Sequence, residues 1–425
     1  MSLLILNAGS SSLKFALFGR PPAHGDGADL PALLTGQVDG LGSHPHLQVT
    51  DTRSGRRHGG PLPADGAHPV RDVGDALEVL FAGLPDWLPG VVVNGIGHRV
   101  VHGGVEFDAP TLIDDAILAR LEALSALAPL HQPFNTAGIR AARRRFPGVP
   151  QAACFDTAFH RGHAFVHDAF ALPREYFDAG VRRYGFHGLS YEYIATRLRE
   201  LDPASAGGRV VVAHLGSGAS LCALRDGRSV ASSMGFTALD GLPMGTRPGH
   251  IDPGVLLWLM TERGMDAAAI TDLLYKRSGL KGLSGVSADM RDLHASKLPD
   301  AARAIDYFVA QLCQQTAAMA AALGGLDGLV FTAGIGEHDA PVRARALAGL
   351  RFLGVEFDPA ANARHGADQD GLISAHGSAV RVHVIPTNEE LMIARHLDAL
   401  TGAAAAGRPH RAGPSGLSPS SATAP

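Results

Sequence analysis

The sequence predicts two similar mixed α/β domains with a cleft between them. Its 425 residues exceed what one ordinary hydrophobic core takes up, so two domains, or three, are expected. Residues 3–18 (LLILNAGSSSLKFALF) and 210–225 (VVVAHLGSGASLCALR) share one order: an apolar strand, Asn or His followed by Gly and Ser, and a returning strand. Amphipathic helices follow both segments, so the chain divides into two related halves.

The composition narrows the class of protein. Apolar residues make up 46% of the chain, as in ordinary globular proteins, and a net charge of −4 offers no field to attract nucleic acid or an anionic membrane. Aromatic residues, at 6%, are few for base stacking. We see neither a membrane-spanning run nor a secretory signal. Cys154, Cys222 and Cys313 are widely spaced and odd in number, so we expect neither disulfides nor a zinc cluster, and a cytoplasmic location.

The first half is expected to open on two buried strands joined by an Asn-Ala-Gly turn. Apolar spacing and turn residues then predict, in order, a Pro/Gly loop at 20–32, hairpin turns and loops at 50–72, a helix at 72–84, a strand running into a glycine turn at 90–104, a helix at 114–131, and a strand at 149–160 that ends on Asp156.

The second half repeats the opening and then becomes helical. The patterns predict three strands joined by turns within 207–230, helices at 253–263, 265–279 and 300–323, a buried strand running into a glycine turn within 325–338, and a strand from 379 leading to a helix that begins near Asn388. Residues 401–425 are rich in Ala, Pro, Ser and Gly, and we expect this tail to be disordered.

Three glycine turns follow apolar strands: NAGSSSLK, HLGSGAS and AGIGEH. Ser10, Ser11, Ser12 and Lys14 on the first turn suit an anion such as phosphate, although a plain β-hairpin would explain the local pattern too. Three such turns favour a nucleotide cleft, because each can offer backbone N–H groups to a phosphate. None of them is a Walker A loop or a GxGxxG turn opening a βαβ helix.

One histidine-rich segment needs a separate decision. His160, His163 and His167 would share a face if FHRGHAFVHD were helical. The run lacks a fixed metal-binding motif and an obvious fourth ligand, so we interpret it as a partly exposed segment rich in His and Phe.

The chain resembles the acetate kinase family. Nine segments occur in that family's order and rough spacing: LNAGSSSLKF, GHRVVHGG, FDTAFH, YGFHGLS, HLGSGAS, SMGFTALDGLPMGTRPG, SADMRDL, FTAGIGEH and PTNEE. The resemblance covers about residues 3–400. It implies two ribonuclease-H-like domains, mixed sheets flanked by helices, around an ATP cleft, as in the actin-like ATPase superfamily. It also implies reversible transfer of the ATP γ-phosphoryl group to acetate, giving acetyl phosphate and ADP.

Four residues match the family's catalytic positions. Arg99 and Arg247 match its two arginines, and a guanidinium fork suits carboxylate or phosphoryl oxygens. His187 matches the histidine held to stabilise the transferring phosphoryl group. Asp156 matches its essential aspartate. A carboxylate acceptor is already deprotonated, so we favour Asp156 orienting an arginine or the metal shell, with proton transfer as the alternative.

The resemblance also places ligands around this centre. Asn7 and Glu389 match the residues that hold Mg²⁺, with Mn²⁺ as an alternative ion. Implied nucleotide contacts are Ser10, Ser12, Lys14, His214, Leu215, Gly216, Ser217, Gly218, Asp289, Met290, Arg291, Gly334, Ile335, Gly336, Glu337 and His338. Residues implied to contact the substrate's acyl group are Arg99, Val101, Leu130, Phe186 and Ala238.

Three positions depart from the family pattern. Ser217 and His338 replace asparagines of the nucleotide segments, and Ala238 replaces a proline of the acyl pocket. The first two concern nucleotide affinity or base choice, and the third leaves a propionate or mixed short-chain acyl kinase as an alternative. A non-catalytic ATP-binding switch protein is a second alternative, since fold alone does not fix function.

The resemblance completes the predicted organisation. We expect a first domain at 1–155, a second at 156–387, and a C-terminal helix at about 388–400 that packs back on the first. As in the family, we expect a homodimer that acts in acetyl-CoA biosynthesis on small molecules, with no nucleic-acid or membrane partner.

Overall fold

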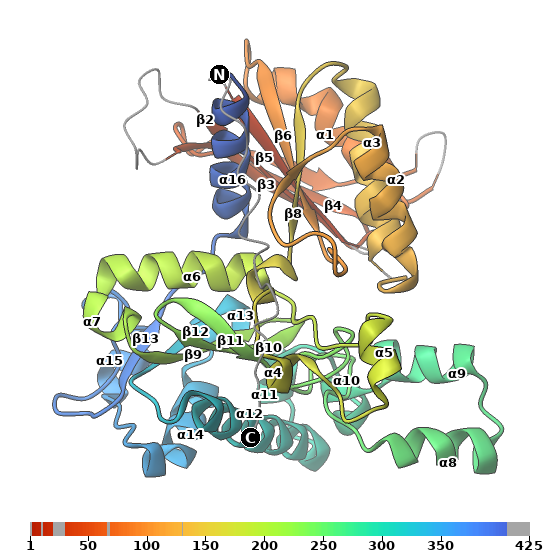
Figure 1. Cartoon of the computed structure of the whole chain (residues 1–425). Helices are drawn as coiled ribbons and strands as arrows, with labels where there is room; N and C mark the ends of the chain where they lie inside the picture. The colour runs from red at the N-terminus through yellow and green to blue at the C-terminus, as the bar shows by residue number, and fades with distance from the viewer. Residues whose placement is uncertain (1, 10–11, 20–29, 66–68, 130, 406–425) are drawn as a thin grey trace, which may run out of the picture.

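A computed structural model describes residues 2–9, 12–19, 30–65, 69–129 and 131–405. The chain forms two lobes, each built on one β-sheet with helices against it (Figure 1). This confirms the predicted fold class. Within the described residues, no helix has both the length and the apolar character needed to cross a bilayer.

The first lobe holds an eight-stranded sheet in the order β5-β4-β3-β2-β1-β6-β8-β7. Its strands are β1 (Ser2–Ala8), β2 (Ser12–Gly19), β3 (Ala32–Asp39), β4 (His46–Asp51), β5 (Arg57–Pro61), β6 (Val93–Val100), β7 (Thr111–Leu112) and β8 (Gln151–Phe155). Strands β1 and β2 pair antiparallel, so the predicted hairpin is confirmed. Strands β1, β6 and β8 run parallel, so their carboxyl ends meet at one edge of the sheet.

The second lobe holds a five-stranded sheet in the order β11-β10-β9-β12-β13. Its strands are β9 (Arg209–Leu215), β10 (Ala219–Arg225), β11 (Arg228–Ser232), β12 (Gly328–Thr332) and β13 (Arg381–Val384). An antiparallel hairpin again lies beside two parallel strands, and the order matches β3-β2-β1-β6-β8 of the first sheet. The sequence repeat therefore corresponds to a structural one.

Both sheets are covered on two faces, because successive strand residues point to opposite sides. In β1, Leu4 and Leu6 pack with α1 (Val73–Trp87) and α3 (Gln132–Arg145), whereas Leu3 and Ile5 pack with α16 (Glu389–Ala405). In β9, Val211 and Ala213 pack with α12 (Pro299–Leu323), whereas Val210 and Val212 pack with α6 (Gly188–Leu201).

The C-terminal helix returns to the first lobe (Figure 1). It lies so close to β6 that a Cβ placed on Gly97 would come within 2.5 Å of Ile393 Cγ2. Helix α16 runs to Ala405 and so includes the first five residues of the predicted tail, and residues 406–425 lie outside the described part.

Shorter helices complete the structure. They are α2 (Asp115–Ala123), η1 (Leu124–Ala126), η2 (Ala158–His160), α4 (Phe165–Asp168), α5 (Arg174–Asp178), α7 (Pro203–Ala206), α8 (Pro253–Arg263), α9 (Ala267–Asp272), η3 (Leu273–Arg277), α10 (Gly279–Ser284), α11 (Met290–Ala295), α13 (Ala333–His338), α14 (Ala340–Gly349), η4 (Arg351–Leu353) and α15 (Pro359–Ala363).

Several local predictions need correction. The segment AGIGEH is helix α13, which starts directly at the end of β12, and not a glycine turn. The predicted helix at 114–131 ends as α2 and η1, and a separate helix, α3, starts at Gln132 with Pro133 in its first turn. The loop predicted at 50–72 contains β5, an edge strand rich in polar residues and glycine.

The histidine-rich segment packs against β11. His160 is buried, and its ring nitrogens contact Ser229 Oγ at 2.8 Å and the Phe186 carbonyl at 2.9 Å. His163 contacts the same Ser229 hydroxyl at 2.7 Å. Among the described residues, no group of three or more His, Cys, Asp and Glu side chains is placed to hold a metal ion by itself. The segment as a whole is partly exposed, as expected, although His160 within it is buried.

Buried histidines make stability depend on pH. Burial lowers the pKa of His98 to about 4, of His160 to about 3 and of His383 to about 4. In the unfolded chain these groups take up protons near pH 6.5, so between about pH 7 and 4 the unfolded state binds more protons than the folded state. We expect the urea midpoint to fall steadily as the pH drops through this window.

A variant pair isolates this effect from that of the carboxylates. His98→Gln keeps a hydrogen-bonding side chain opposite Gln151 and should flatten the pH slope of the midpoint. The exposed His376→Gln should leave the slope unchanged. A wild-type midpoint that stays constant or rises toward pH 4 would contradict the prediction.

Candidate active site

One half of the site lies where β1, β6 and β8 end. Arg99 donates two hydrogen bonds to Asp156, from Nε to Oδ1 at 2.9 Å and from Nη2 to Oδ2 at 2.5 Å. Its Nη1 donates to Asn7 Oδ1 at 3.2 Å. The parallel register places these residues together, and Asp156 is nearly fully buried beneath the guanidinium.

Helix α16 brings acidic groups to the same place. Asn7 Nδ2 lies 3.4 Å from both Glu389 Oε2 and Glu390 Oε1, and Glu389 lies 3.8 Å from Arg99 Nε. Burial raises the pKa of Glu389; Arg99 opposes this rise, while Asp156 and Glu390 add to it. Burial is thus the main cause of the rise, and Arg99 and Lys14 are the cations that oppose it.

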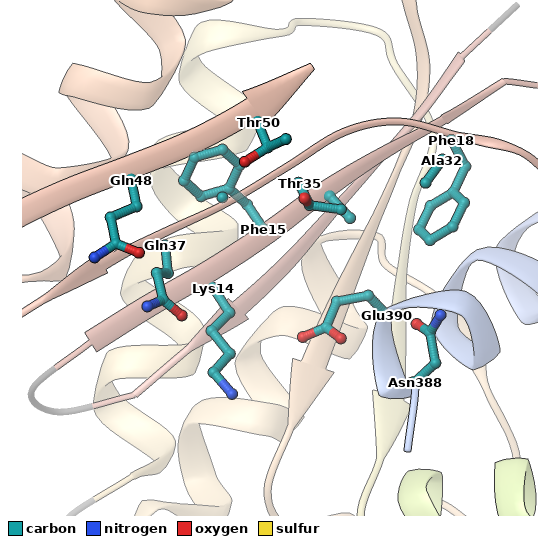
Figure 2. Close-up of a pocket in the computed structure, with 12 residues that line it drawn as sticks. Lys14, Phe15, Phe18, Ala32, Thr35, Gln37, Gln48, Thr50, Asn388 and Glu390 are labelled. Carbon is teal, nitrogen blue, oxygen red and sulfur yellow. The ribbon is translucent and has the colours of Figure 1, made fainter. Parts of the chain in front are cut away.

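A pocket of about 360 Å³ adjoins the acidic cluster (Figure 2). Lys14 of β2 and Glu390 of α16 both line it, beside amide and hydroxyl side chains of β3 and β4. The charge of Lys14 also lowers the pKa of Glu389 and that of His214 in the other lobe. This places the predicted phosphate-facing lysine at the site. Ser12 begins β2, whereas Ser10 lies outside the described residues.

The other half of the site comes from the second lobe. His187, with a left-handed backbone (φ 57°), precedes α6, and its ring stacks on His214 with centroids 4.2 Å apart. Its Nδ1 lies 2.8 Å from Ser220 Oγ, which fixes the ring. Burial lowers the pKa of His187 well below its usual value, and His214, Arg99 and Arg247 lower it further, so the imidazole is neutral near pH 7.

Arg247 is a cation without a carboxylate partner among the described residues. Its Nη1 donates to the Ala238 carbonyl at 2.7 Å, and burial lowers its pKa. A Cβ on Gly218 would lie 2.9 Å from Arg247 Nη2 and 3.2 Å from His187 Nε2. The glycine therefore leaves open space in front of both side chains. Arg99 also lowers the pKa of Arg247, so the two guanidinium groups are electrostatic neighbours.

The predicted acyl-pocket residues lie in the hydrophobic core of the second lobe. Val101 from the end of β6 joins Phe186 and the partly buried Ala238 there. Leu130 lies outside the described residues. Three of the four apolar positions therefore belong to one hydrophobic cluster.

Apart from Ser10, Ser12 and Lys14, the predicted nucleotide residues occupy three places. His214, Leu215, Gly216, Ser217 and Gly218 form the end of β9 and its turn; Asp289, Met290 and Arg291 start α11; and Gly334, Ile335, Gly336, Glu337 and His338 form α13. Leu215 and Met290 are buried in the core. Arg291 pairs with Asp289 at 2.6 Å, and His338 is exposed.

The sequence interpretation missed two residues of this region. His131 precedes α3, and its pKa is lowered to about 4 by burial and by the nearby Arg99 and Arg247. It was assigned to the end of a helix, although a histidine between Pro129 and Pro133 is poorly placed inside one. Glu390 was missed because Glu389 alone matched the family pattern.

Two lobes with matching sheet orders and two neighbouring guanidinium groups able to bind anions indicate a phosphotransferase. The acetokinase family profile matches residues 2–395, and the chain belongs to that family. The acetate kinase of Nitrobacter hamburgensis is 54% identical over 93% of this chain and 95% of its own length. That of Rhizobium meliloti is 52% identical over 95% of this chain and 99% of its own length.

Solved structures agree with this assignment. The acetate kinase of Porphyromonas gingivalis superimposes with a TM-score of 0.81 at 35% identity, covering 94% of this chain and 99% of the other. A propionate kinase from Francisella tularensis gives a TM-score of 0.83 at 35% identity, with the same coverage.

Proposed function

We propose that the protein catalyses the reversible transfer of the γ-phosphoryl group of ATP to acetate, giving ADP and acetyl phosphate. One observation carries the proposal. Arg99 and Arg247 both lie close enough to the neutral His187 to lower its pKa, and Arg247 has no carboxylate partner in the described part of the chain. Two anions must meet for this reaction, so a guanidinium group that no carboxylate neutralises, that of Arg247, is what the chemistry needs beside Arg99.

The catalytic residues divide the work by charge and geometry. Arg99 and Arg247 hold the acetate carboxylate and the transferring phosphoryl group in line, as bidentate donors do. His187, being neutral, donates one hydrogen bond to a phosphoryl oxygen without a further positive charge. Asp156 keeps Arg99 in place through two hydrogen bonds, which supports an orienting role over proton transfer.

The acidic cluster fits a hard divalent cation. Glu389 and Glu390 offer carboxylate oxygens, which Mg²⁺ prefers, and the amide of Asn7, whose Oδ1 accepts from Arg99 Nη1, lies 3.4 Å from both carboxylates. We propose that Asn7 and Glu389 hold Mg²⁺, or Mn²⁺ in its place. When bound, the ion would neutralise charge on the nucleotide phosphates.

Hydroxamate trapping of the acyl phosphate tests the reaction directly. With ATP, Mg²⁺ and carboxylates of one to four carbons, we expect acetate to be phosphorylated. Arg99→Ala and Arg247→Ala should each lower kcat/KM about 10²–10⁴-fold, because a preorganised charge at the transferring group is lost.

Two controls keep this prediction interpretable. Arg303→Ala removes an exposed arginine of α12 that pairs with Asp300 at 2.8 Å and has no predicted part in the site, so it should cost far less activity. Circular dichroism should show all three variants folded. A folded Arg247→Ala enzyme within threefold of wild type would remove Arg247 from the mechanism.

Ala238 bears on the length of the acyl chain. Its side chain packs in the cluster that holds Val101 and Phe186, where the family commonly has a proline ring. We therefore expect propionate to be used with kcat/KM within about tenfold of acetate, since one methylene in an apolar pocket is worth about 1–3 kcal/mol.

Restoring the ring tests this effect of Ala238. Ala238→Pro keeps the carbonyl that Arg247 contacts, so the guanidinium should stay in place while the pocket shrinks. We expect the ratio of acetate to propionate kcat/KM to rise by up to about tenfold. An unchanged ratio would show that position 238 does not set chain length.

We propose that the protein is a cytoplasmic homodimer acting in acetyl-CoA biosynthesis. Helix α8 contains no buried residue and projects with α9 from the second lobe (Figure 1). It exposes Leu257 by 64%, Trp258 by 47% and Met260 by 47%. Contiguous exposed apolar side chains of this kind support a protein interface, and a second copy of the chain is the partner that family membership suggests.

Light scattering after size exclusion tests the homodimer. We expect the wild type to elute at twice the 44.2 kDa chain mass, and Leu257→Asp to shift the mass toward one chain, because a buried, unpaired carboxylate opposes association. Val92→Asp changes an equally exposed apolar residue of the first lobe and should leave the dimer intact. A dimer unaffected by Leu257→Asp would place the interface elsewhere.

A further inference from the structure

Glu337 was assigned to the nucleotide, yet its carboxylate is used inside the protein. Its Oε1 accepts hydrogen bonds from the backbone N–H of Ala333 at 2.7 Å and of Thr387 at 3.1 Å. The side chain is only 14% exposed. Ala333, the first residue of α13, has a left-handed backbone (φ 64°), which costs energy in a non-glycine residue unless contacts hold it.

Thr387 belongs to the segment between β13 and α16, two residues before Glu389. Its hydroxyl lies 2.8 Å from Ser190 Oγ, which in turn lies 2.8 Å from His214 Nδ1. The Glu337 carboxylate therefore joins the nucleotide segment α13 to the residues that lead into the acidic cluster, and this junction continues to the histidine stacked on His187.

A buried arginine fixes the other side of α13. Arg343 Nη1 donates to the carbonyls of Gly336 and Glu337, each at 2.9 Å. Its Nε donates to Asn362 Oδ1 at 2.9 Å, and its side chain is fully buried. Arg343 therefore fixes the backbone of α13 at Glu337. The Glu337 side chain, through its hydrogen bond from Thr387 N–H, then fixes Thr387 relative to α13.

We propose that Glu337 is a positioning residue that holds the nucleotide segment 334–338 in register with the segment carrying Glu389. It acts by accepting two backbone hydrogen bonds with one oxygen, and not by presenting negative charge to a ligand. This inference rests on the proposed function of the site, since it assigns the nucleotide to α13.

Two substitutions at Glu337 separate the effect of side-chain length from the effect of charge. Glu337→Gln keeps the length and one accepting oxygen but loses the charge, whereas Glu337→Asp keeps the charge but is one methylene too short to reach both N–H groups. We expect Glu337→Gln to keep KM for ATP within about threefold of wild type, and Glu337→Asp and Glu337→Ala to raise it about tenfold or more. KM for acetate should change less than twofold in all three.

Calorimetric binding of ADP without added metal gives a readout independent of turnover, and its affinity should fall in the same order. If Glu337→Gln is as damaging as Glu337→Asp or worse, the carboxylate acts through its charge and the proposal is wrong. Lower thermal stability in Glu337→Asp with unchanged KM and ADP affinity would show a merely structural role and also overturn it. A wild-type enzyme that binds ADP but phosphorylates no carboxylate would refute the proposed function, while the order of ADP affinities would still decide the role of Glu337.

Discussion

The Arg99–Asp156 pair is the interaction on which the rest of the site depends. Asp156 holds the guanidinium at the end of β6 with both carboxylate oxygens, and its main-chain carbonyl accepts from Gly188 N at 2.9 Å. That second bond fixes the start of α6, and therefore His187, against the first lobe. A Cβ at Gly188 would lie 2.2 Å from the same carbonyl, so only glycine allows this approach. Asp156 thus positions the Arg99 guanidinium in its own lobe and the start of a helix in the other.

The site combines cations with neutral rings for a physical reason. Two neighbouring guanidinium groups repel each other. A further positive charge would increase this repulsion without adding a directional hydrogen bond to an anion. Burial lowers the pKa values of His131, His187 and His214, and Arg99 lowers all three further, so these rings stay uncharged near the guanidinium groups. They can then offer hydrogen bonds to an anion while the arginines supply its counter-charge.

Much of the fold could be predicted from the sequence, because strands buried on both faces read as continuous apolar runs and the two hairpins share one pattern. Helix α13 was missed because three of its first four residues, Ala333, Gly334 and Gly336, are small and resemble a turn. The assigned residues Asn7, Arg99, Asp156 and Glu389 come together at a sheet edge. The burial of His131 near the arginines and the internal hydrogen bonds of the Glu337 carboxylate could not be predicted. Neither a motif nor periodicity tells which buried group a side chain will contact.

The matching strand orders of the two sheets have an evolutionary consequence. Asn7 and His214 occupy equivalent positions at the ends of β1 and β9, each just before a glycine of its hairpin. Duplication and fusion of one unit would account for both hairpins, and the two copies now differ in chemistry: one carries an amide beside carboxylates, and the other an imidazole beside hydroxyl groups. Selection could therefore alter the cation-binding end and the histidine end separately, while the shared strand order kept them facing each other.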